Sequence, residues 1–208
     1  VISLLRGFPN NASLQREWLT MIAVSASFVV PELGPVVGAL GGFDVLFDAI
    51  DRFRGMPDVM MSAWRGLSDP SHSAYGAAAI ANRGGALKGI DFIVGQMRSH
   101  PQPHLAEDPY DHLTLKYEIM QIASGLLQND AAGVYGAALV AAGFLPQMLY
   151  AMRAEPDLRA TQDVACRCMV SLVERNASVA KPLADQGAAL QISAAVRRFR
   201  SVPDNTPW

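Results

Sequence analysis

Three histidines and three carboxylates crowd one short, polar stretch of the sequence, residues 99–112. They are His100, His104, His112, Glu107, Asp108 and Asp111. Imidazole and carboxylate groups are common ligands of transition metals. However, their spacing matches no zinc pattern, and the prolines at 101 and 103 exclude a regular helix there. The stretch is predicted to be a surface loop inserted between two helices, with a metal site as the less favoured alternative.

The two cysteines form a C-x-C pair, Cys166 and Cys168. Positions two apart on a helix point about 200° away from each other, so the pair cannot converge on one metal ion. Packing is therefore the favoured role for these thiols. Two cysteines also cannot build a disulfide framework, which favours the cytoplasm or another reducing intracellular compartment. Location in an organelle is the alternative.

No motif for catalysis is present. The glycines of GALGG and NRGG lack the sequence context of a phosphate-binding loop, and no nucleophile elbow or Ser–His–Asp arrangement is found. A net charge of −2 gives no indication of nucleic-acid binding. The sequence predicts a protein that is not an enzyme and needs no cofactor, small-molecule substrate or nucleic acid.

The elements that carry these residues are predicted from apolar residues spaced i, i+3, i+4 and i+7, the pattern of a helix with one buried face. One set of stripes reads Phe43/Leu46/Phe47/Ile50, Ile90/Ile93/Val94/Met97, Leu145/Met148/Leu149/Met152 and Ala189/Ile192/Val196. A second set reads Leu19/Ile22/Ala23/Ala26, Met60/Ala63/Trp64/Leu67, Ile119/Ile122/Ala123/Leu126 and Ala165/Cys168/Met169/Leu172. Small-residue runs, two of them containing YGAA, form the third element. The chain is predicted to be all-α, with about four repeated units.

The chain resembles the armadillo repeat family. The resemblance rests on GFDVLFDAIDRF followed by MMSAWRGLS, in which Ala63, Trp64 and Leu67 match the family's second-helix pattern. It implies a right-handed α-solenoid of armadillo-like repeats, with a groove lined by the third helices. It also implies binding of an extended segment or another subunit, without catalysis. Residues 1–208 are expected to be one repeat domain of a longer chain, because Val1 already leads into a helical pattern.

The expected groove helices carry charged residues at matching positions. Asp51, Arg98, Arg153 and Arg197 follow the last stripe residue of each unit, with Asp44, Asp48, Asp91, Gln147 and Tyr150 at other exposed places. The first unit carries acidic side chains on this face and the later units carry basic ones. This arrangement could bind a partner segment in one direction. The alternative is an ordinary solvated face. These helices lack the Trp and Asn of armadillo proteins that bind nuclear import signals, so that function is not expected.

The stretch from Met21 to Gly42 is apolar, with Glu32 as its one charged residue. Its length permits a membrane span, but its prolines and its place in the repeat pattern favour buried helices. The function indicated by the sequence is a non-catalytic, protein-binding scaffold within a larger assembly. The alternatives are a membrane-associated structural subunit, or a metal-binding protein that uses the histidine-rich loop.

Overall fold

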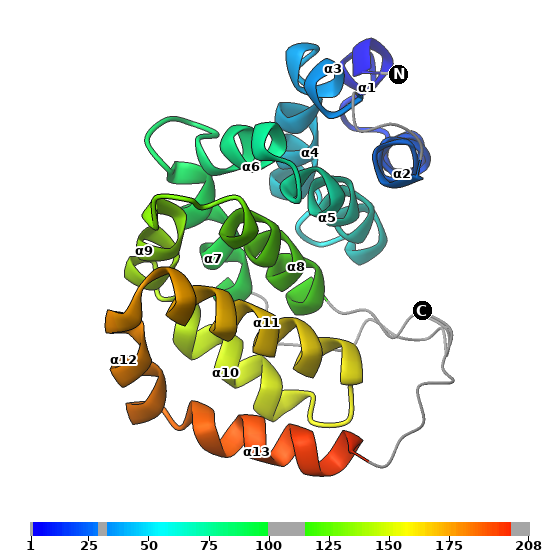
Figure 1. The fold of residues 1–208 in the computed structure, drawn as a ribbon. Coiled ribbons are helices and arrows are strands. Elements are labelled where there is room, and N and C mark those ends of the chain that lie inside the picture. The colour runs from blue at the N-terminus through cyan, green and yellow to red at the C-terminus, as the bar shows by residue number, and fades with distance from the viewer. Residues whose placement is uncertain (1, 29–32, 100–114, 201–208) are drawn as a thin grey trace.

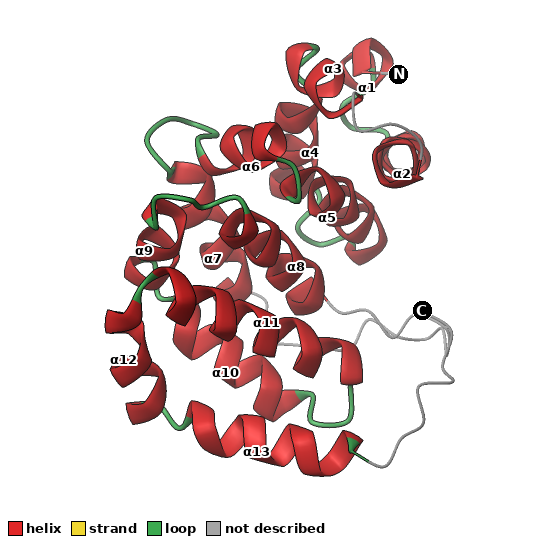
Figure 2. Ribbon diagram, viewed as in Figure 1, coloured by secondary structure: helices red, strands yellow, loops and turns green. Residues whose placement is uncertain are grey.

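A computed structural model describes residues 2–28, 33–99 and 115–200 of the chain. Every regular element in these ranges is a helix, as Figure 2 shows. The all-α prediction is therefore confirmed. Most of the histidine-rich stretch 99–112 lies outside the described residues; only Ser99 is described, as the last residue of a helix.

The longest helices of the described ranges form one row (Figure 1). Each packs along the next, α2 against α5, α5 against α8, and α8 against α11. They carry the second set of predicted stripes, and Leu19, Trp64 and Ile122 are completely buried. Their bounds are α2 Ala12–Phe28, α5 Pro57–Ser71, α8 Leu115–Gln128 and α11 Arg159–Arg175.

A second group of helices carries the first set of stripes and packs behind this row. α4 contacts α5, α7 contacts α8, and α10 contacts α11, while α10 also touches α7 and α13. The stripe is buried in α4, α7 and α10 but not in α13, where Val196 is 56% exposed. The bounds are α4 Gly42–Arg52, α7 Lys88–Ser99, α10 Phe144–Ala154 and α13 Ala188–Phe199, with the short α1, Ile2–Gly7, packed on α4.

Short helices made of small residues connect the two groups. The two YGAA sequences fall in equivalent places, in α6 and α9. Gly76 of the first lies so close to the preceding helix end that a Cβ atom there would be 2.0 Å from the Pro70 carbonyl oxygen. Glycine is therefore required at this position, because even alanine would clash with the carbonyl group. These elements are α3 Leu33–Ala39, α6 Ala74–Ala81, α9 Val134–Ala141 and α12 Ala180–Asp185, the last preceded by a 3₁₀ turn at Ala177–Val179.

A left-handed residue precedes each helix of the second group. Gly41, Gly143 and Gly187 have φ of 76°, 85° and 83° at the N-caps of α4, α10 and α13. Gly42 itself is the first residue of α4. Before α7 the left-handed residue is Leu87, with φ of 65°. A side chain in this conformation costs roughly 1–2 kcal/mol, which glycine avoids.

The first backbone hydrogen bond of a long helix shows which residues are equivalent in different units. The amides of Gln15, Met60 and Gln162 donate to the carbonyls of Asn11, Met56 and Leu158. Gln15, Met60 and Gln162 are therefore equivalent. The predicted stripes paired Met60 with Leu19 and with Ala165, and both pairings lie about one helical turn too far along their helices. The apolar pattern recurs at every turn, so it defines the face of a helix better than its starting point.

Two buried glutamines support this correspondence. The side chain of Gln15 donates to the carbonyls of Leu5 and Phe8, at 2.9 and 3.1 Å. Gln162 donates in the same way to Met152 and Glu155, both at 2.9 Å. Each glutamine thus satisfies carbonyl groups at the end of the preceding helix, which have no partner within that helix.

Candidate interaction surface

The predicted partner-binding residues all lie on the second group of helices. All are exposed except Gln147, which is half-buried. They are distributed over α4 (Asp44, Asp48, Asp51), α7 (Asp91, Arg98), α10 (Gln147, Tyr150, Arg153) and α13 (Arg197). They therefore form a line across successive helices and not one compact cluster.

Several of these residues are already engaged within the chain. Asp48 pairs with Arg83 and Asp51 with Arg54, each at 2.7 Å. The guanidinium of Arg83 also lies 4.9 Å from the centre of the Phe47 ring. Asp48 and Asp51 thus have intramolecular roles that need no partner protein.

Arg98 connects two successive units. Its guanidinium donates to the carbonyl of Ala142, the residue before the left-handed Gly143. Arg6 of α1 makes the same connection two units earlier, to the carbonyl of Leu40 before Gly41, at 3.3 Å. The chain separation is 34 residues for Arg6 and 44 for Arg98, which matches an insertion of about ten residues in the later unit. Both arginines therefore join neighbouring units.

Sequence reasoning missed Arg6, although the necessary pattern was present. Arg6 follows the buried Leu5 as Arg98 follows the buried Met97. The opening residues were interpreted as helical, but they were not aligned with the later stripes.

The remaining charges lie at helix ends. Asp44 and Asp91 are in the first turns of α4 and α7, whereas Arg153 and Arg197 are in the last turns of α10 and α13. Acid at the N-terminus and base at the C-terminus of a helix are favoured by the helix dipole. None of the four makes an ion pair or hydrogen bond within the described part of the chain. They are the predicted residues with charge available to a partner.

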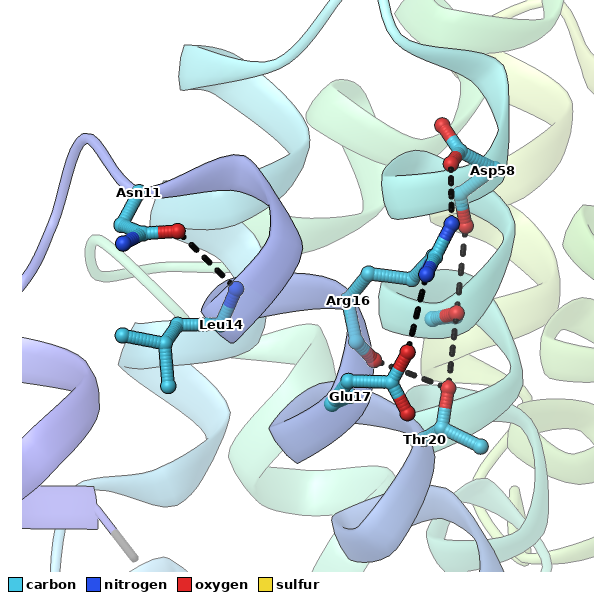
Figure 3. A network of polar contacts seen from close by, with 7 residues as sticks. Asn11, Leu14, Arg16, Glu17, Thr20 and Asp58 are labelled. Carbon is cyan, nitrogen blue, oxygen red and sulfur yellow. Dashed lines mark hydrogen bonds and ion pairs between the residues drawn. The ribbon is translucent and has the colours of Figure 1, made fainter.

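The row of long helices has polar contacts at its first junction, shown in Figure 3. Arg16 of α2 pairs with Asp58 of α5 at 3.3 Å, and with its neighbour Glu17 at 2.9 Å. Hydrogen bonding to Glu17 and then Asp58 raises the pKa of Arg16 above its ordinary value. The hydroxyls of Thr20 and Ser62 are 3.0 Å apart across the same junction.

Similar contacts cross the next two junctions. Arg65 of α5 pairs with the buried Glu118 of α8 at 3.2 Å. Arg167 of α11 donates to the side-chain oxygen of Gln121 of α8 at 3.3 Å. The polar groups of this row are thus largely used between helices. These cross-helix pairs could not be found from sequence, because the partners are far apart in the chain.

A buried polar cluster lies where α8 meets α10 and α11. Lys116 is 1% exposed, and its ammonium group lies 4.0 Å from the centre of the Tyr150 ring. Burial lowers the pKa of Lys116, while attraction to the Glu155 carboxylate raises it. Thr161 donates to Glu155 at 2.6 Å. Tyr150 therefore covers a buried lysine, in addition to presenting an exposed edge.

The cysteines occupy the positions expected for packing. Cys168 is completely buried and donates to the Met120 carbonyl, with a sulfur–oxygen distance of 3.4 Å, whereas Cys166 is half-buried. Burial raises the pKa of Cys168 to about 12. Among the described residues, no group of three or more metal-ligating side chains is found.

No described helix is by itself long and apolar enough to cross a bilayer. The pair α9 and α10 reaches the required length and composition only together, and a bend of 72° separates the two helices.

Comparisons of the chain with protein-family models, with curated proteins and with solved structures give no significant match.

Proposed function

We propose that the chain is an armadillo-like α-solenoid that serves as a non-catalytic scaffold for a partner protein. Support for the solenoid comes from the repeated contacts of α2, α5, α8 and α11 and from the equivalent glutamines Gln15 and Gln162. A row of helices that contact mainly their neighbours is typical of repeat proteins, whose extended surfaces bind other chains.

The proposed binding surface is the edge formed by the C-terminal ends of α10 and α13. These helices contact each other, and their last turns carry Arg153 and Arg197. Both arginines are exposed and have no ion-pair partner within the described residues. This availability is the observation that carries the proposal, since the polar side chains of the long row mostly bind one another.

The expected partner is an acidic segment, because arginine binds carboxylates through two parallel hydrogen bonds. Asp44 and Asp91, at the opposite ends of α4 and α7, would contact basic residues of the same partner. The change from negative to positive charge along the surface would then select one orientation of the bound partner.

The test is a pull-down from the native source that compares wild type with the double variant Arg153→Glu, Arg197→Glu. A matched control, Lys88→Glu with Lys181→Glu, makes the same change in net charge at exposed positions away from this edge. We expect one protein to be lost with the arginine variant and retained with the control. The same set of captured proteins for all three would contradict binding at this edge.

A further inference from the structure

The last three helices form an apolar hollow that no other element covers within residues 2–28, 33–99 and 115–200. It has a volume of about 380 Å³ and lies between α11, α12 and α13. Its lining is apolar except for Glu174, and includes Met169, Val170, Val173, Leu183 and Ile192. Val170 is 55% exposed, although valine is usually buried in a helical core.

The earlier units show what covers this place. α8 lies on α5, α6 and α7, the helices that correspond to α11, α12 and α13. With Met60 equivalent to Gln162, Ser68 and Ser71 of α5 correspond to Val170 and Val173. Both serines are buried, and Ser71 lies against Gly125 of α8. The hollow therefore lies where another long helix would pack.

At the other end of the row, the exposed face of α2 is equivalent to the face with which a long helix packs on the preceding unit. Glu17 and Met21 of α2 are exposed, Met21 by 53%. Because Gln15 corresponds to Gln162, the equivalent residues of α11 are Val164 and Cys168. Both are completely buried, and Cys168 bonds to α8. In α11 this face is the one that packs on the preceding long helix.

Charges are also complementary between the two ends. At the α2–α5 junction, Thr20 contacts Ser62 at 3.0 Å. The residue equivalent to Thr20 in α11 is Arg167, and the residue equivalent to Ser62 in α2 is Glu17. Repeating the same junction between two molecules would place Glu17 of one opposite Arg167 of the other. Each would then exchange its present contacts within the chain, Glu17 with Arg16 and Arg167 with Asp163 and Gln121, for the contact between molecules.

We propose that this chain associates head to tail, with α2 of a second copy lying on the α11–α13 hollow as α8 lies on α5–α7. The contact uses two different surfaces of each molecule, so it does not close on itself at two copies. The product is an open-ended row of long helices that continues from one molecule into the next. This surface is separate from the basic edge formed by Arg153 and Arg197.

The test is sedimentation velocity on the 208-residue chain over roughly 5–200 μM, which covers micromolar affinity. We expect the average mass to rise with concentration and to pass beyond a dimer. Val170→Glu and Met21→Glu should each abolish this rise, because a charge would enter an apolar contact. Val134→Glu makes the same kind of change at a 47% exposed position on α9 and should associate like wild type.

Mixing the two blocked variants gives the decisive result. Val170→Glu keeps an intact α2 face and Met21→Glu keeps an intact hollow, so an equimolar mixture should form one dimer and nothing larger. Unchanged far-UV circular dichroism will show that both variants fold. A chain that stays monomeric at every concentration, association that stops at a dimer, or a mixture that stays monomeric would each overturn the proposal.

Discussion

Trp64 offers the strongest single test of how the helices pack together. Its side chain is completely buried on α5 and stacks on Phe92 of α7, with ring centres 6.2 Å apart and planes 27° apart. Replacing Trp64 with Ala removes this contact and leaves a cavity between the two helices.

The size of the effect follows from the buried area. A buried tryptophan removes roughly 150–250 Å² from water, equivalent to about 4–6 kcal/mol at about 25 cal/mol per Å². Partial collapse of the cavity reduces the measured cost of such substitutions to about 3–5 kcal/mol. We therefore expect Trp64→Ala to lower the free energy of unfolding by about 4 kcal/mol.

Urea unfolding followed by far-UV circular dichroism measures this loss by linear extrapolation. Trp64→Phe is the matched variant. The indole N–H has no hydrogen-bond partner within the described residues, so this change loses only part of the ring, at a cost of about 1–2 kcal/mol. A loss below about 1 kcal/mol for Trp64→Ala would refute the packing described for this side chain.

Two further predictions concern Arg98 and the cysteines. Arg98→Ala should lower the free energy of unfolding by about 1 kcal/mol, because it removes the bond to the Ala142 carbonyl, whereas Arg153→Ala should cost under about 0.5 kcal/mol. Equal losses in urea unfolding would contradict the proposed connection. With a thiol reagent at mildly alkaline pH, Cys166 should react in the folded protein and Cys168 only after unfolding. Since folding raises the Cys168 pKa from 9.0 to about 12, its contribution to stability is complete below pH 9 and is lost as the pH rises to about 12. Cys168→Ala should therefore show a smaller loss of stability over this range than wild type, and an equal loss would contradict this assignment.

Much of the helical organisation could be predicted from the sequence because burial imposes a period on apolar residues. The stripes identified the correct faces of α4, α5, α7, α8, α10 and α11. The repeated YGAA also marked equivalent short helices correctly. The predicted starting points of α2 and α11 relative to α5 were wrong by one turn. Their residues equivalent to Met60 are glutamines, Gln15 and Gln162, which do not continue the apolar pattern.

The candidate surface was harder to predict, because exposure and charge do not reveal intramolecular partners. Arg98 and Asp48 were both expected to face a partner protein. Their contacts, with the Ala142 carbonyl and with Arg83, bring together residues that are distant in the chain. The role of Gln162 was equally hidden, since a buried glutamine is explained only by the carbonyl groups that it reaches.

The uneven burial along the row has a mechanical consequence. Each long helix contacts chiefly its neighbours, and α13 leaves Leu190 and Val196 exposed, by 72% and 56%. Under tension applied to the two chain ends, elements held by fewer buried groups detach at lower force. We therefore expect α13, with two buried residues, to detach before α11, and the α5–α8 centre to resist longest. Extension would occur in a series of small steps of one or two helices, and not in one cooperative event.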